Sequence, residues 1–187
     1  MSAGRPMRYA LIYGALAGAV TICLIILTLV LELPDHLHSE WFGYLVMLVA
    51  LSMIFVGVKR YRDVERGGVI RFVPALGVGL GIAVVAALIY VIGWEIFLAT
   101  NDSSFIAEYM REYLAGMVRD MQAEGATPAA IQAKITETEG MVEAYKNPLF
   151  RMPLTFVEIF PVGLLVALVS AAILRNPRVL PARAAAA

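Results

Sequence analysis

The chain of 187 residues contains a single cysteine and few charged residues, and both shortages narrow what it can be. With Cys23 alone, no disulfide can form within the chain, and the ordinary role of such a residue is that of a small buried apolar side chain. Charged residues make up 16% of the sequence and hydrophobic residues 60%. A soluble domain of this length cannot bury so much apolar surface. The composition therefore indicates an integral membrane protein.

Sequence signatures of catalysis are also missing. The chain has no phosphate-binding loop and no G-x-S-x-G, H-E-x-x-H or C-x-x-C motif. Its basic residues are explained by membrane topology, so they give no support to nucleic-acid binding. We therefore expect no enzymatic activity, no cofactor and no nucleic-acid partner.

Four long apolar runs dominate the chain, at residues 9–33, 41–58, 72–98 and 154–174. A helix that rises about 1.5 Å per residue needs about 20 residues to cross the roughly 30 Å hydrocarbon layer of a bilayer. The runs therefore predict an all-α membrane protein with four transmembrane helices. Residues 1–98 hold the first three helices, and residues 154–187 hold the fourth helix and a tail.

The distribution of basic residues predicts the orientation in the membrane. Arginines precede the first run and follow the last, and a cluster of lysine and arginine occupies residues 59–71. Residues 34–40 contain neither lysine nor arginine. Because basic residues favour the cytoplasmic side, we expect both termini to be cytoplasmic.

Residues 99–153, between the third and fourth runs, predict a helical hairpin on the extracytoplasmic side. Apolar residues recur at helical spacing on both sides of Gly125, and Thr127-Pro128 is typical of a helix start. We expect two antiparallel helices, over residues 103–124 and 128–146. Such a hairpin could order the neighbouring spans, or it could serve as a lid or a partner-binding surface.

Small residues recur every four positions in two of the apolar runs. They are Ala10, Gly14 and Gly18 in the first run and Gly77 and Gly81 in the third. This spacing lets helix backbones approach closely in lipid. It predicts close helix packing, and the same residues could form an interface between copies of the chain.

Acidic residues near the predicted outer boundary of the membrane are the sharpest chemical feature. Charged side chains within the bilayer are costly, so they usually face the bundle interior or water and have a partner. We predict a polar cluster at this boundary, formed by Glu32, Glu95, Glu158, Arg151, His36 and His38. Glu95 and Glu158 are expected to point into the bundle, with Arg151 as the cation.

Three roles are open for this polar cluster. It could be a structural network that sets helix register, a pathway for protons or ions, or a metal site. Pro161 should loosen the helix beside Glu158 and expose carbonyl groups that water or an ion could use. We expect no metal, because a His-x-His sequence on a short loop is common by chance.

The connection between the second and third runs carries a second polar group. Lys59, Arg60 and Arg62 lie at the predicted level of the lipid headgroups, so we expect them to contact anionic lipids. Asp63 lies among these cations and should pair with one of them.

Several stretches with polar landmarks resemble a known family. They are Phe-Val-Gly-Val-Lys-Arg-Tyr-Arg-Asp at 55–63, the segments 67–72 and 89–95, and Asn147-Pro148 followed by residues 155–164. These stretches are similar to the bacterial membrane family catalogued as domain of unknown function 4199 (DUF4199), from the first span to Leu174. The resemblance implies a bacterial inner-membrane protein with this layout of spans, and it implies no activity.

The function expected from these features is that of a non-enzymatic accessory or structural membrane protein that acts through partners. The alternative is a small oligomeric transporter or channel that uses Glu95 and Glu158. Because four helices make only a narrow pathway, transport would favour a dimer or larger homo-oligomer. An intramembrane enzyme or metalloprotein ranks third.

Overall fold

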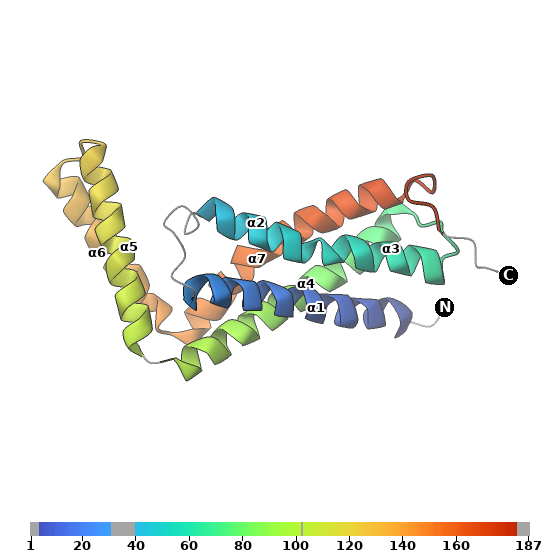
Figure 1. The fold of residues 1–187 in the computed structure, drawn as a ribbon, viewed down its shortest axis with the longest axis horizontal. Coiled ribbons are helices and arrows are strands. Elements are labelled where there is room, and N and C mark those ends of the chain that lie inside the picture. The colour runs from blue at the N-terminus through green and yellow to red at the C-terminus, as the bar shows by residue number, and fades with distance from the viewer. Residues whose placement is uncertain (1–3, 31–39, 102, 183–187) are drawn as a thin grey trace. The chain divides into compact units, whose positions relative to one another are not determined.

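A computed structural model describes residues 4–30, 40–101 and 103–182, and within these ranges the chain forms seven α-helices and no strand (Figure 1). The helices belong to two compact units. Unit 1 comprises Met1–Trp94 and Thr155–Ala187, and unit 2 comprises Glu95–Leu154. The all-helical fold expected from the sequence is confirmed for the described residues.

Four helical segments are long and apolar enough to cross a bilayer, as the four apolar runs predicted. These spans are Pro6–Leu29, Gly43–Glu65, Phe72–Thr100 and Pro148–Leu174. They come from α1 (Gly4–Val30), from the consecutive helices α2 (Glu40–Leu51) and α3 (Met53–Glu65), from α4 (Phe72–Thr100) and from α7 (Pro148–Leu174). The spans indicate a multi-pass membrane protein.

The second span differs from its predicted range because it continues to Glu65 and is interrupted at Ser52. The Ser52 hydroxyl donates a hydrogen bond to the carbonyl oxygen of Val49 at 2.6 Å. A serine hydroxyl that bonds back to the preceding turn competes with the regular helix pattern. The charged residues after Val58 stay helical, so the apolar run alone underestimated the length of this span.

Close packing of α1 against α4 depends on glycine. A β-carbon on Gly14 would lie 2.5 Å from Cβ of Val85, and one on Gly18 would lie 2.5 Å from the carbonyl oxygen of Ala86. Both distances are shorter than real contacts, so only glycine lets the two helix backbones come this near. The predicted packing role of these two residues is confirmed.

The other small residues of the pattern divide into one pair that packs and one glycine that does not. A β-carbon on Gly81 would lie 3.2 Å from that of Ala10, which places this pair on the same α1–α4 contact. Gly77 is exposed, and no described residue outside its own part of α4 lies within 4 Å of the position of a β-carbon, so its predicted packing within the chain is wrong, and its place in an interface between copies stays a prediction. The α1–α4 contact lies within the chain, and its glycines are therefore not free to join two copies.

Helix α4 is the centre of unit 1, because α3 and α7 also pack closely against it. A β-carbon on Gly79 would lie 2.9 Å from Cβ of Ala167 in α7, and one on Gly163 would lie 3.0 Å from Cβ of Ala83. On α3, a β-carbon on Gly57 would lie 2.6 Å from Cδ1 of Ile82, the movable end of a side chain of α4. Small residues therefore set the distance of α4 from α1 and from α7.

Unit 2 contains a helical hairpin formed by α5 (Ser103–Ala123) and α6 (Pro128–Tyr145), within one residue of the predicted bounds. Gly125 ends α5 with a φ of 78°, and the amide of Ala126 donates to the carbonyl oxygen of Met121 at 2.9 Å. The Thr127 hydroxyl accepts a hydrogen bond from the amide of Ala130 at 3.3 Å and caps α6. The turn chemistry expected from the sequence is confirmed.

Two further expectations are wrong. Helix α7 begins at Pro148, six residues before the apolar run, because Asn147 starts it. The Asn147 side chain accepts from the amide of Leu149 at 3.0 Å, and its carbonyl oxygen accepts from the amide of Arg151 at 3.0 Å. Cys23 is exposed rather than buried, because it lies outside the α1 face that packs on α4.

Candidate functional site

An ion pair in unit 2 joins Glu95, on α4, to Arg151, on α7. Nε of Arg151 donates to Oε1 of Glu95 at 2.7 Å, and Nη2 of the same guanidinium donates to Oε2. Two parallel hydrogen bonds between these groups form the strongest type of ion pair that side chains make. The predicted partner of Glu95 is confirmed.

Tyr145, on α6, completes the surroundings of this ion pair. Nη1 of Arg151 donates to the carbonyl oxygen of Tyr145 at 3.3 Å, and the guanidinium lies 5.7 Å from the centre of the tyrosine ring. The side chains of Arg151 and Glu95 are 13% and 21% exposed. Both charges are therefore largely withdrawn from the surface and are satisfied within unit 2.

The position of the ion pair suggests what it does. Glu95 is the first residue of unit 2, and Arg151 lies three residues before the unit ends at Leu154. The pair thus joins the two points at which the chain enters and leaves the hairpin. A carboxylate held by both oxygens cannot exchange protons or ions without breaking the pair, so this geometry fits a structural clamp.

Glu158 differs from the expectation that it points into the bundle and is paired. Its side chain is exposed, and it makes no hydrogen bond or ion pair with the residues that the structure describes. The buried face of α7 runs through Thr155, Ile159, Gly163, Ala167, Ser170, Ala171 and Leu174. Consecutive helical residues lie about 100° apart, so Glu158 is turned away from this face.

The remaining members of the predicted polar cluster cannot be placed. Glu32, His36 and His38 lie outside the described residues, so the six-residue cluster stays a prediction. Within the described part of the chain, no group of three or more His, Cys, Asp or Glu side chains could hold a metal ion. The hydroxyl of Thr155 is buried and has no hydrogen-bond partner among these residues.

The basic residues of α3 behave differently from one another. Arg62 is fully buried, and all three of its nitrogens donate within the protein, so its predicted contact with lipid headgroups is wrong. Lys59 is half-buried and donates to Oδ2 of Asp63 at 2.5 Å, which confirms that Asp63 pairs locally. Arg60 is exposed, and its contact with lipid stays a prediction.

Some partners in these networks were missed by sequence reasoning. The carbonyl oxygens of Val179 and Leu180 accept from Arg62, and Tyr9 donates to Glu65 at 3.4 Å. A backbone carbonyl carries no residue-specific signal, so the contact of Arg62 with the tail could not be found from the sequence. The tyrosine could have been suspected only from its place at a helix end.

The comparisons with known proteins give one family match. A family model described as "Protein of unknown function (DUF4199)" matches residues 8–176. Neither the search of curated proteins nor the search of solved structures finds a match.

Proposed function

This chain belongs to the DUF4199 family, and we propose that it is a non-enzymatic accessory protein of the bacterial cytoplasmic membrane that acts by binding partners. The observation that supports this role most is the close packing of the spans in unit 1. At Gly14 and Gly18 in the contact with α1, and at Gly79 and Gly163 in the contact with α7, an added β-carbon on the glycine would lie 2.5 to 3.0 Å from atoms of the facing helix, so these contacts of α4 leave no room for an added methyl group. Such packing favours a rigid scaffold over a pathway between these helices.

The clamp between Glu95 and Arg151 supports the same role. It uses the charge of one intramembrane acid for a fixed contact at the base of the hairpin. A hairpin held in this way is suited to present a surface to another protein. Helix α6 has no buried residue, and Met141 on this helix is 54% exposed.

We assign the hairpin to the extracytoplasmic side and both termini to the cytoplasm. The support is the positive charge near the start of α1, between α3 and α4, and after α7. The test is labelling with a membrane-impermeant maleimide in intact cells, with Cys23→Ala as the background. Glu124→Cys at the hairpin turn should react at once, and Ala182→Cys should react only after the membrane is opened. The reverse pattern would disprove this orientation.

The accessory role is tested by photo-crosslinking in living cells. A photoreactive residue at Met141 on α6 should form an adduct with a discrete protein. The same residue at Leu165, an exposed apolar position of α7, should form adducts with lipid. If Met141 gives no protein adduct in cells that express the chain normally, the hairpin is not the surface that binds partners.

A small oligomeric transporter or channel is the second candidate, because Glu158 is an exposed carboxylate within a predicted span. The cost of a lone charge in lipid would be relieved if Glu158 faced a hydrated path between copies of the chain. Flux of protons or cations into proteoliposomes, lost in Glu158→Gln while the protein remains folded, would favour this candidate over the accessory role. Equal flux in Glu158→Gln, or no flux in either protein, would exclude it.

A further inference from the structure

Acidic and basic side chains differ in exposure at the end of unit 1 where α1 and α4 begin and α3 and α7 end (Figure 1). The two acids at this end, Asp63 and Glu65, are half-buried, and both accept hydrogen bonds from neighbouring side chains. The exposed charges described here are all arginines, namely Arg8, Arg60, Arg66, Arg71, Arg175 and Arg178, which we call the arginine surface. This surface therefore carries unopposed positive charge.

Arg62 attaches the segment after α7 to this end of the unit. We call the described part of this segment, residues 175–182, the tail. Its Nε donates to Oδ1 of Asp63 at 2.7 Å, and its Nη1 donates to the carbonyl oxygen of Val179 at 3.0 Å. Its Nη2 donates to the carbonyl oxygen of Leu180. A fully buried guanidinium is stable only when its donors are satisfied in this way, so the contact holds the tail firmly.

The tail is shaped to make this contact. The amide of Val179 donates to the carbonyl oxygen of Asn176 at 3.1 Å, and Leu180 has a φ of 48°, which is uncommon for a residue with a β-carbon. A β-carbon on Gly68, in the turn between α3 and α4, would lie 3.1 Å from Cβ of Ala182. The tail is therefore folded back onto the α3–α4 turn, which brings Arg178 to the same end as Arg66 and Arg71.

We propose that the arginine surface binds the phosphate groups of anionic phospholipid headgroups, and that Arg62 is a positioning residue that holds Arg178 in this surface. Guanidinium groups bind phosphate with paired hydrogen bonds, and each of the four helical segments long and apolar enough to cross a bilayer has one end at this level, which fits the depth of the lipid headgroups. Arg62 itself does not contact lipid here, because it is buried. The proposal does not depend on the accessory role.

The lipid contact is tested with the full chain in mixed micelles. Thermal unfolding is followed as phosphatidylglycerol, phosphatidylcholine or inorganic phosphate is added. Phosphatidylglycerol should raise the unfolding temperature more than phosphatidylcholine, and high salt should remove the difference. Equal shifts with both lipids, or the same shift with inorganic phosphate, would overturn the proposal.

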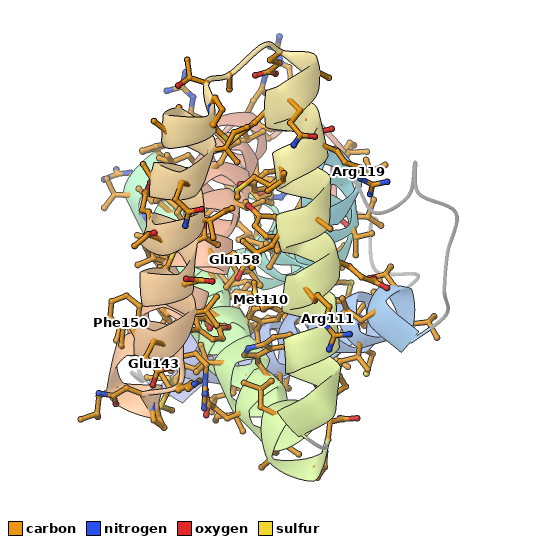
Figure 2. All side chains as sticks on the ribbon, turned by 90° about the vertical axis from the view of Figure 1, so that its left-hand side faces the viewer. Met110, Arg111, Arg119, Glu143, Phe150 and Glu158 are labelled. Atoms are coloured by element: carbon orange, nitrogen blue, oxygen red, sulfur yellow. The ribbon has the colours of Figure 1, made fainter. Side chains whose placement is uncertain are left out.

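A matched pair of double variants separates the arginine surface from net charge. Arg175→Gln/Arg178→Gln should need about 25-fold more phosphatidylglycerol for half of the shift, since each basic residue near an anionic surface contributes about fivefold. The control Arg111→Gln/Arg119→Gln makes the same charge change on exposed arginines of α5, and Figure 2 shows Arg119 on the side of α5 that faces away from α6. An equal loss in both variants would mean that only net charge matters.

The positioning role of Arg62 has its own readout. Arg62→Lys keeps the charge but cannot hold two carbonyl groups and Asp63 together. Trypsin should then cut after Arg178 at least several times faster than in the natural protein, and the lipid preference should fall toward that of Arg175→Gln/Arg178→Gln. Arg60→Gln, which changes an exposed arginine with no hydrogen bond to the described residues after α7, should leave the cutting rate unchanged. Unchanged cutting in Arg62→Lys, or loss of the lipid preference without faster cutting, would refute the positioning role.

Discussion

The close approach of α1 to α4 can be tested with two glycines that differ only in their surroundings. Gly18 faces α4, and an added β-carbon would meet the carbonyl oxygen of Ala86 at 2.5 Å and Cβ of Ile89 at 2.8 Å. At Gly77, none of the residues that the structure describes, apart from its own helical turn, comes within 4 Å of the same position. Alanine in place of either residue therefore makes the same chemical change in two different environments.

The expected magnitude follows from these distances. Ordinary carbon contacts begin at 3.4 Å, so Gly18→Ala must push the two helices apart by about 1 Å, and overpacking of this kind costs about 1–3 kcal/mol. Both variants gain the same helix propensity from alanine, at most about 1 kcal/mol. Gly18→Ala should therefore be less stable than Gly77→Ala by about 1–3 kcal/mol.

The measurement is the free energy of unfolding of the purified chain in mixed micelles, obtained by titration with a denaturing detergent. Gly77→Ala should match the natural protein or exceed it slightly. The reasoning fails if Gly77→Ala is destabilised as much as Gly18→Ala, because the two glycines would then have equivalent surroundings. A smaller residue at Ile89, combined with Gly18→Ala, should recover part of the loss by making room for the new methyl group.

Three further predictions concern unit 2. Glu95→Gln should lower the free energy of unfolding by roughly 1–3 kcal/mol, because Arg151 then keeps a largely buried charge without its carboxylate, and adding Arg151→Gln should cost less than the sum of the two single changes. Strict additivity in this double-mutant cycle would mean that the pair contributes nothing. Gly125→Ala should destabilise the hairpin by about 1–2 kcal/mol, because its φ of 78° is unfavourable for alanine, whereas Gly140→Ala in α6 should be neutral or stabilising. Amide exchange in α6 should become faster in Gly125→Ala and stay unchanged in Gly140→Ala. Thr127→Ala should also make it faster, because the helix then loses about 1 kcal/mol of capping.

The two candidate functions make different demands on the acids. A scaffold needs Glu95 in its ion pair and can tolerate Glu158→Gln with little loss. A transporter needs Glu158 to change its protonation or its ligand during each cycle, which the paired Glu95 cannot do as readily. If the chain is a scaffold, Glu95→Gln should impair its function more than Glu158→Gln does. If it is a transporter, Glu158→Gln should be the more harmful change.

The sequence by itself determined the number and type of the long elements. Apolar length is a local property, so the four spans could be counted without knowledge of any contact. The hairpin turn was equally local, because glycine at positive φ and threonine before proline act within a few residues. The partner of Glu95 was predictable for a simpler reason, since Arg151 was the only cation close to the start of the last predicted span.

Only the tertiary structure decided which faces of the helices are buried. Gly77 and Gly79 are two residues apart in one apolar helix, and packing alone makes the first exposed and the second a contact of Ala167. Arg62 had the sequence context of a surface cation, yet the fold returns the tail to its guanidinium and buries it. In an apolar helix every face looks alike in sequence, because lipid and protein interior are both hydrophobic, so the neighbours of each face are set by the assembled bundle.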